Sequence, residues 1–527
     1  MTGRSRRPAL ARRLGAALLT VGLAACDPVG PDYARPKADV PERFDSAGPW
    51  REGTPQDTIA RGDWWTVFGD PTLDGLQADA VRQSPDLRAA AARVLQAQAV
   101  AGISRSYLFP EVNAGVLAQR FANNSNFATL VDPATVTTNT PVITNAYKAM
   151  PLYAQWELDF WGRVRRLAES SRADLDASIA AYQAAMLTLN AEVALAYFEI
   201  RTTDELVRLL QRTVALHRDT LQLFRARAEG GLGNDVIVAE VDSTLRTVEA
   251  QVQALEVQRA RLVNRLAVLT GRPPEGFALA PQPLPGSAPP VPVGVPSDLL
   301  QRRPDIAKAE RDMAAANAQI GVAVAAFYPN VVLTTGVGYE GFSLSTLTNP
   351  TSNIWGIGFS LFQQVFNAGR VSLNVERSRA AYEEKVAVYQ GQLLRAFQEV
   401  ETALAALGLL ERQASLQKLA VEAASRRAAL SVQRYQQGLN SLLEALVAQR
   451  AELAAQSVAV QIANDRLLTT VALIKALGGG WQDRARQVPE GSRSMWAPPV
   501  QPAPPAATPA APPPPAAPSA ASGGAAD

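Results

Sequence analysis

The sequence has almost no residues that could build a metal or thiol site. Among its 527 residues there is one cysteine, Cys26, and one histidine, His217. A Cys/His metal site or a Cys–His dyad needs more of these residues than one chain provides. The sequence also offers no recognisable phosphate-binding loop, acid–base pair or activated nucleophile. We therefore expect a protein with no metal, no cofactor and no enzymatic activity.

Long apolar segments and an excess of charge are missing as well. No apolar run reaches the roughly eighteen residues of a membrane-spanning helix, which excludes a polytopic helical membrane protein. The formal net charge is +2, but the first 25 residues contain five arginines and no acid, so the remaining chain carries −3. No stripe of basic residues with interleaved aromatics is present, which argues against a nucleic-acid partner.

The most prominent feature is the stretch Arg165–Ala228, which contains neither proline nor glycine. Apolar residues recur along two seams with alternating spacings of four and three, which places both seams on one side of a helix. The first seam is Ile179, Met186, Val193, Ile200, Val207, Val214 and Leu221. The second is Leu175, Tyr182, Leu189, Ala196, Thr203, Leu210, His217 and Phe224. At 1.5 Å per residue the stretch predicts a helix of roughly 95 Å that packs against partner helices, with His217 as a packed seam residue.

The long helical stretch and its flanking motifs occur twice. Gly162-Arg163-Val164 returns as Gly369-Arg370-Val371, 207 residues later, whereas Pro85-Asp86-Leu87 and Pro304-Asp305-Ile306 are 219 residues apart. The twelve-residue difference between the two spacings falls between these landmarks, in the first half of the chain. The sequence therefore predicts two tandem repeats, and the proline-rich residues 272–297 form the boundary between them.

The N-terminus has the pattern of a signal peptide. Arginines precede a short apolar region, Leu14–Leu23, which is too short to span a bilayer. The following Leu-Ala-Ala-Cys looks like a lipobox, so we expect cleavage before Cys26 and a lipid on its thiol; an ordinary signal peptide with an incidental cysteine is the alternative. Such an anchor tethers a chain to a membrane surface without spanning it. Asp27 resembles an inner-membrane retention signal of enteric bacteria, which bears on sorting.

Each repeat is expected to consist of a helix, a β-hairpin, the long helix and a return helix. The predicted helices of the first repeat are about 74–107 with a break near Pro85, the long helix, and about 235–269. The predicted strands are about 111–120, 147–158, 330–342 and 353–362, with a polar loop over 121–146. The helix before a hairpin and the return helix together match the length of the long helix, so each repeat would form two antiparallel rods.

The last predicted strand has one apolar face and one face of small residues. Trp355, Ile357, Phe359 and Leu361 share the first face, and Gly356, Gly358 and Ser360 share the second. This alternation suits a barrel wall with lipid outside and water inside. The edge of a soluble sandwich is the alternative interpretation.

Several short motifs occur in a fixed order along the chain. They are LAAC (ending at Cys26), GPDYARP (Gly30–Pro36), WWTVFGDPTLDGL (Trp64–Leu76), Phe109-Pro110, WELDFWGRVRR (Trp156–Arg166), RRPDI (Arg302–Ile306), Tyr328-Pro329, FNAGR (Phe366–Arg370), RYQQGLNSLLEAL (Arg434–Leu446) and KALGGGW (Lys475–Trp481). Together they resemble the outer-membrane factor family, the TolC-like channels, and in particular the lipoprotein efflux subunits called NodT or OprM type. The resemblance covers about residues 22–482, and the order of the motifs within the duplication makes it specific.

The resemblance implies an α+β membrane fold. Each chain of a homotrimer would give four strands to a shared twelve-stranded transmembrane β-barrel in the outer membrane, and its helices would form an α-helical barrel tunnel through the periplasm. The residues agree independently, because four short strands cannot close a membrane barrel alone and open edges are not tolerated in lipid. The implied partners are outer-membrane lipid, a periplasmic adaptor (membrane fusion) protein and an inner-membrane transporter of the RND type.

The resemblance also gives the helix-turn tips a role. In the family these tips meet the adaptor and close the tunnel; the matching residues here are Gly231, Leu232, Gly233, Gly438, Leu439 and Asn440. Family channels often narrow this end with acidic rings. Glu444 occupies one acidic position, the next is Val447, and Asp235 and Glu240 could supply charge instead. The alternative is that these acids are solvated residues favoured by the helix dipole.

The expected organisation and function follow from these features. The segments are a lipoprotein signal peptide (1–25), an extended N-terminal segment (26–73), the first repeat (74–271), the linker (272–297), the second repeat (298–482) and a disordered Ala/Pro-rich tail (483–527). The expected function is a passive outer-membrane exit duct for small molecules in a tripartite efflux system. The alternatives are an exit duct for type I protein secretion and a non-conducting coiled-coil structural lipoprotein.

Overall fold

The computed structural model describes residues 27–36, 61–123, 142–231, 234–286, 289, 303–341, 343–347 and 349–479. All of these described residues belong to one compact unit. The predicted signal peptide with Cys26, the tip residues Leu232 and Gly233, and the Ala/Pro-rich tail lie outside the described residues.

The described helices follow the predicted order. After a 3₁₀ helix η1 (Arg61–Phe68), they are α2 (Pro71–Gln83), α3 (Pro85–Ser106), α4 (Arg163–Glu229), α5 (Asp235–Leu269), α7 (Pro304–Ala325), α8 (Arg370–Gln436) and α9 (Leu442–Ala476). The long helices α4 and α8 have 67 residues each, the return helices α5 and α9 have 35 each, and α3 and α7 have 22 each. The predicted long helix and the helix break at Pro85 are therefore confirmed, while the helix expected from about residue 74 already begins at Pro71.

Glycines in the left-handed region set the ends of both long helices. Gly162 (φ 78°) and Gly369 (φ 81°) precede α4 and α8, and Gly231 (φ 73°) and Gly438 (φ 74°) follow them. A residue with a Cβ atom adopts this backbone conformation only at an energetic cost. The glycines duplicated in the sequence thus mark the points where the chain leaves a strand or turns back.

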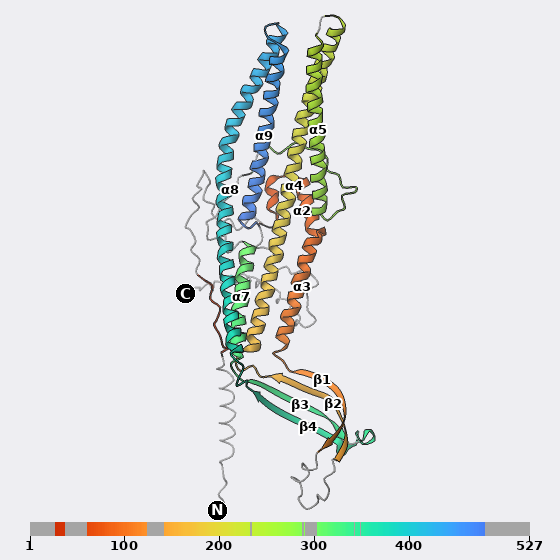
Figure 1. The fold of residues 1–527 in the computed structure, drawn as a ribbon, viewed down its shortest axis with the longest axis vertical. Helices are drawn as coiled ribbons and strands as arrows, with labels where there is room; N and C mark the ends of the chain where they lie inside the picture. The colour runs from red at the N-terminus through yellow and green to blue at the C-terminus, as the bar shows by residue number, and fades with distance from the viewer. Residues whose placement is uncertain are drawn as a thin grey trace, which may run out of the picture. The chain divides into compact units, whose positions relative to one another are not determined.

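The strands form one antiparallel sheet at the start of the long helices. Its members are β1 (Glu111–Asn123), β2 (Val142–Glu157), β3 (Asn330–Gly341) and β4 (Asn353–Phe362), in the order β1-β2-β3-β4. Figure 1 shows the sheet at one end of the helices and the helix-turn tips at the other. All four predicted strands are confirmed.

The first hairpin reaches further than predicted. Phe121 pairs with Thr144, and Asn123 pairs with Val142, so both strands extend into the residues expected to form a polar loop. The prediction of a loop over 121–146 was wrong at both ends, because backbone pairing and not side-chain polarity decides where a ladder stops.

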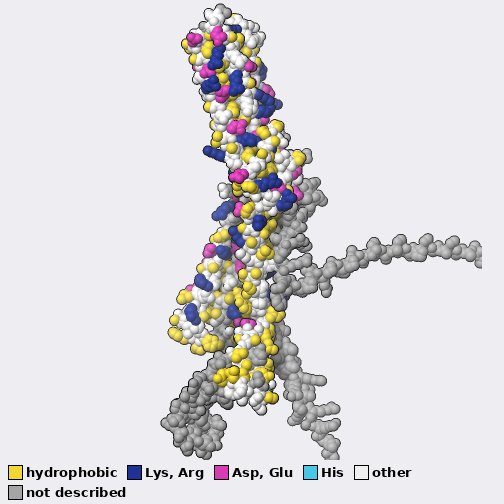
Figure 2. Space-filling model, turned by 90° about the vertical axis from the view of Figure 1, so that its right-hand side faces the viewer, with side chains coloured by type: hydrophobic (Ala, Val, Ile, Leu, Met, Phe, Trp, Pro, Cys, Tyr) yellow, Lys and Arg dark blue, Asp and Glu magenta, His cyan; other side chains and the backbone are white. Residues whose placement is uncertain are grey.

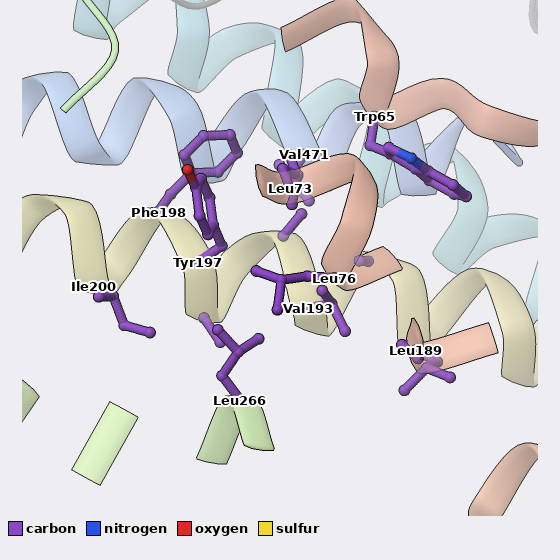
Figure 3. Packing of buried hydrophobic residues seen from close by; sticks show 14 of the residues in the cluster. Trp65, Leu73, Leu76, Leu189, Val193, Tyr197, Phe198, Ile200, Leu266 and Val471 are labelled. Carbon is purple, nitrogen blue, oxygen red and sulfur yellow. The ribbon is translucent and has the colours of Figure 1, made fainter. Parts of the chain in front are cut away.

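The largest buried cluster lies where α2 and η1 pack on the middle of α4. Trp64, Trp65 and Leu73 contact α4 there and are at most 7% exposed. Figure 3 shows Val193, Tyr197 and Phe198 of α4 among them, with Leu266 of α5 and Val471 of α9 close by. The aromatic motif Trp64–Leu76 therefore seals a packing layer on α4.

Among the described residues, one helix is long and apolar enough to meet the length and composition of a membrane span. This helix is α4, and half of its most apolar window is buried inside the chain. The helix also carries the buried ion pair of Arg201 and Asp204, whose side chains are 1% and 3% exposed. Burial against neighbouring helices accounts for the apolar window without a lipid contact.

Candidate functional site

The sheet separates an apolar face from a polar one across all four strands. Strand register places Val112, Leu152, Ala154, Trp156, Leu333, Thr335, Val337, Tyr339, Trp355, Ile357, Phe359 and Leu361 on one face. The other face holds Glu111, Asn113, Tyr153, Gln155, Glu157, Thr334, Gly336, Gly338, Glu340, Gly356, Gly358 and Ser360, together with the apolar Val332 and Ile354. Trp355 and Ile357 are 78% and 70% exposed, so no other part of the described chain covers the β4 row of the apolar face. The arrangement suits lipid on one side and water on the other.

The surface changes character between sheet and helices. On the face drawn in Figure 2, basic and acidic side chains are interspersed along the helices, whereas the sheet end is largely hydrophobic or uncharged. Two carboxylates of the polar face are paired with cations: Glu340 lies 3.9 Å from Lys148, and Glu157 lies 2.6 Å from Arg163 at the start of α4. A chain with this distribution can place its sheet in a membrane and its helices in water.

Both edges of the described sheet are open. β1 pairs only with β2 and β4 only with β3, which leaves two unpaired ladders. The helices show the same incompleteness: α7 packs against both α4 and α8, whereas the extensive packing of α3 is with α4. Exposed apolar residues lie along the uncovered sides, namely Leu95, Val100 and Ile103 of α3 and Leu373, Val388 and Leu394 of α8.

A strap formed by residues 27–36 crosses the helices next to the sheet. The Arg166 side chain, 4% exposed, fixes the strap by donating to Asp32 Oδ1 at 2.7 Å and to the carbonyls of Pro28, Val29 and Gly30. The backbone N–H of Val29 also donates to the carbonyl of Trp161 at 3.0 Å.

The strap also contacts the second half of the chain. Asn317 of α7 donates to the Pro31 carbonyl at 2.9 Å, and Arg35 lies 3.3 Å from Glu310 of α7. Tyr33 packs on a cluster of α7 and α8 residues, and burial together with the negative charge of Glu310 raises its pKa to about 12. The strap therefore joins the two halves where the helices meet the sheet. Its first described residue, Asp27, directly follows Cys26.

The RRPDI motif joins three helices. Arg303, 6% exposed, donates to both carboxylate oxygens of Asp305, to Glu399 of α8 at 2.5 Å and to the carbonyl of Ala476 at the end of α9. Burial opposes ionisation of Asp305, but the Arg303 hydrogen bonds outweigh it and hold the pKa of that carboxyl below its ordinary value.

The acids expected at the tips have different surroundings. Asp235 is the exposed first residue of α5. Glu444 has an exposed side chain, and its backbone N–H donates to Ser441 Oγ at 3.3 Å. Glu240 is instead bound, because its carboxylate lies 3.4 Å from Arg450 of α9. Of the three, Asp235 and Glu444 have no ion-pair partner among the described residues.

The tips of the two helix pairs touch within one chain. Tyr435 at the end of α8 lies against Phe224 of α4, with ring centroids 6.2 Å apart, and its hydroxyl accepts from Arg227 at 3.5 Å. Of the candidate adaptor-contact residues, Gly231, Gly438, Leu439 and Asn440 lie at the two turns, and Leu439 is 62% exposed. The structure therefore brings the predicted residues of both turns to one end of the helices.

Sequence reasoning missed the residues that connect segments far apart in the sequence. Arg166, Arg303 and Arg450 each contact elements more than ninety residues away in sequence. In the sequence Arg166 and Arg303 were visible only as parts of motifs, and Arg450 had no signal because its partners Glu240 and Thr244 lie on another helix pair.

Comparison with known proteins identifies the family. The family model described as outer membrane efflux protein matches residues 76–272 and again 295–479. The pyoverdine export outer membrane protein OpmQ of Pseudomonas aeruginosa is 36% identical over 423 residues, which cover 80% of this chain and 87% of OpmQ. The solvent efflux pump outer membrane protein SrpC of Pseudomonas putida is 32% identical over 86% of this chain and 95% of its own. The solved structure of the outer-membrane channel OprN superposes with a TM-score of 0.78 at 30% identity, over 86% of this chain and 99% of that one.

Proposed function

This chain belongs to the outer membrane efflux protein family, and from this we propose that three copies close into one passive exit duct for small molecules. As a member it is the outer-membrane channel subunit of an efflux system. The observation that carries the proposed assembly is the pair of complementary open edges, one at α3 and β1 and the other at α8 and β4.

The internal duplication indicates what covers these edges. Position 321 in α7 corresponds to Gly102 in α3, and position 166 in α4 corresponds to Leu373 in α8. Gly321 is filled by Arg166 and the strap, whereas a Cβ on Gly102 would meet no atom within 4 Å and Leu373 is 61% exposed. The α8 edge of one copy is therefore expected to pack on the α3 edge of the next, as α4 packs on α7 within the chain.

A head-to-tail contact of this kind closes a ring when the rotation from one copy to the next is a whole fraction of a full turn. With four strands per copy, three copies give the twelve-stranded barrel that removes every open edge from lipid. The polar face with its glycines would then line the lumen, and the row from Trp355 to Leu361 would face lipid. The helices would continue the lumen as a tunnel.

The remaining partners follow from the two ends of the chain. The strap holds Asp27 beside the sheet, so a lipid on Cys26 would enter the membrane next to the barrel. The tips around Gly231 and Gly438 are the free ends for a periplasmic adaptor, through which an inner-membrane transporter of the RND type would deliver cargo. OpmQ exports pyoverdine and SrpC serves a solvent efflux pump, so the cargo proposed here is small molecules.

The tip acids give the duct a candidate gate. Glu444 and Asp235 are exposed and unpaired among the described residues, so a threefold axis would turn each into a ring of three carboxylates that favours cations. Glu240, which is bound by Arg450, would enter such a ring only when that contact breaks.

The decisive experiment reconstitutes the purified full-length chain in planar bilayers. Native mass spectrometry should give a trimer, and the bilayers should show discrete conductance steps. A trimer without conductance would exclude the duct and favour a non-conducting structural lipoprotein. In the cell, deletion of the gene should raise accumulation of compounds in a panel of small molecules. Unchanged accumulation together with loss of a secreted protein would indicate protein secretion instead.

A further inference from the structure

The only histidine of the chain lies buried in the contact between the two helix pairs. His217 of α4 is 1% exposed, one turn from Val214 and Leu221. Those two residues belong to a cluster with Val241 and Leu245 of α5 and Leu446 of α9. The Nδ1 atom of His217 is buried and has no hydrogen-bond partner. The imidazole is therefore buried beside a cluster to which both helix pairs contribute, with one ring nitrogen unpartnered.

A cation of the opposite helix pair faces this imidazole. Arg450 of α9 acts on His217 through its charge, and burial together with this charge lowers the pKa of His217 below its ordinary 6.5. The same guanidinium donates to Thr244 Oγ1 and lies 3.4 Å from Glu240, both on α5. Arg450 thus ties α9 to α5 directly beside the histidine.

Burial and the charge of Arg450 are the two influences on His217, and both disfavour a proton on its imidazole. The nearby acids of α5 already have cationic partners. Glu240 of α5 is paired with Arg450, and Glu249 of α5 is paired with Arg218 and Arg246. Asp242 of α5 likewise lies near Arg225 and Arg246. An imidazolium would therefore be a buried, unpaired charge next to a second cation, which is strongly unfavourable.

We propose that His217 is an acid-sensitive latch between the helix pairs α4–α5 and α8–α9. Protonation of its imidazole loosens α9 from α4 and α5, because the charged ring must be hydrated. Water reaches the ring only when the helices separate. Because the loosened state binds the proton more tightly than the packed state does, acid shifts the population toward the loosened state. The loosening itself follows from the contacts of one chain; its consequence, a wider periplasmic end in acid, rests on the proposed function.

The test measures the separation of α5 and α9 directly. Spin labels on cysteines introduced at the exposed positions Ala250 and Ala454 report the distance by pulsed electron paramagnetic resonance. Cys26 is the only natural cysteine, so the chain without the introduced pair measures background labelling. Labelled chains are diluted with unlabelled ones so that distances within one chain dominate. Bilayer conductance of the same preparations is recorded in parallel.

The distance distribution should shift to longer values between pH 7.5 and pH 5, with a half-point below 6.5. His217→Gln, which stays neutral, should remove the shift. Arg450→Gln keeps the histidine but removes its cationic neighbour and should at least halve the shift. No shift in the parent chain, or an undiminished shift in His217→Gln, would overturn the latch. A shift in a chain that never conducts would retain the latch and refute the duct.

Discussion

Gly30 of the strap lies so close to Gly321 of α7 that neither has room for a side chain. A Cβ on Gly30 would lie 2.5 Å from the Cα of Gly321, and one on Gly321 would lie 2.9 Å from the carbonyl oxygen of Val29. Gly30 also has a φ of 96°, which residues with a Cβ rarely adopt. The strap is thus seated by backbone contact that the sequence alone did not reveal.

Gly30→Ala should release the strap without unfolding the helices. Strain and overlap together should cost about 1–3 kcal/mol. Since about 1.4 kcal/mol corresponds to a tenfold change in population, chymotrypsin cleavage after Tyr33 should become roughly 5- to 150-fold faster. The matched control is Gly391→Ala in α8, where a Cβ meets nothing within 4 Å and helix propensity should slightly improve. Equal cleavage rates in parent and Gly30→Ala would mean that the strap is not seated by this contact.

The contact between Arg303 and Asp305 should make stability depend on acid pH. The folded-state pKa of Asp305 is lower than its unfolded value of 3.8, so its contribution is complete above that value and is lost as the pH falls through the folded pKa. Asp305→Asn should cost about 1–3 kcal/mol at neutral pH, because Arg303 stays buried with fewer acceptors. The variant should also flatten the loss of thermal stability below about pH 4.

Asp312→Asn is the control for this experiment. Asp312 pairs with Lys308 four residues away on the surface of α7, with the lysine 46% exposed. Its replacement should change stability by less than about 0.5 kcal/mol. A larger loss in Asp312→Asn than in Asp305→Asn would contradict the assignment of Arg303 as the residue that joins the three helices.

Assembly should depend on two apolar residues between β4 and α8. Val365 and Phe366 are 95% and 84% exposed within the chain. The residues 207 positions earlier are Leu158 and Asp159. They lie in the packed junction where the Leu158 N–H donates to the Val331 carbonyl and where nearby Trp161 stacks at 4.7 Å on Tyr328, the counterpart of Phe109. By this correspondence Val365 and Phe366 should pack on the exposed Phe109 of a neighbouring copy.

Replacing both Val365 and Phe366 by Ser should therefore prevent trimer formation. Each substitution should remove about 1.5–3 kcal/mol of favourable burial free energy, and this loss recurs at every subunit contact of the ring. The trimer should then be too unstable to form. Native mass spectrometry in detergent should show monomers. Leu344→Ser is the control, since Leu344 is 69% exposed in the turn between β3 and β4, and it should leave the trimer intact. A stable trimer of the double variant would place the subunit contact elsewhere.

The gate proposal predicts a change in ion selectivity. Glu444→Ala removes an exposed carboxylate from the tip but leaves the backbone N–H that Ser441 caps, so the fold should be unaffected. In planar bilayers under a salt gradient, the reversal potential should move toward lower cation preference, and more so at low ionic strength, where screening is weak. Identical reversal potentials for parent and variant would remove Glu444 from the gate and leave it as a residue favoured by the helix dipole.

Local patterns in the sequence were sufficient to predict the elements. The seven-residue period from Leu175 to Phe224 predicted α4 to within two residues at its start, and Asn234 with Asp235 marked the start of α5. The alternation of Trp355 and Gly356 predicted β4 and its two faces. These features depend on residues that are close together in the sequence. They can therefore be predicted from a single sequence without a structure.

Long-range contacts could not be predicted in the same way. Glu240 was assigned to a gate by its place near a turn, and only the fold shows Arg450 holding it. His217 was correctly interpreted as a packed seam residue, but the cation beside it lies 233 positions away. The end of the first hairpin was misjudged because Asn123 and Val142 pair through their backbones, which side-chain composition does not report.

The strap has a consequence for how copies find one another. Because the chain is duplicated, the same helix contact occurs twice. One contact is between α4 and α7 within the chain, and the other is between α8 and the proposed neighbouring copy. A single N-terminus can cover only one of them, and Arg166 with Gly321 selects the seam inside the chain. At the second contact Leu373 stands in place of that arginine, and the strap is already bound at the first contact. Two halves with the same order of elements are thereby made distinguishable. Each copy presents one helix contact that is complete within the chain and one that only a neighbouring copy can complete.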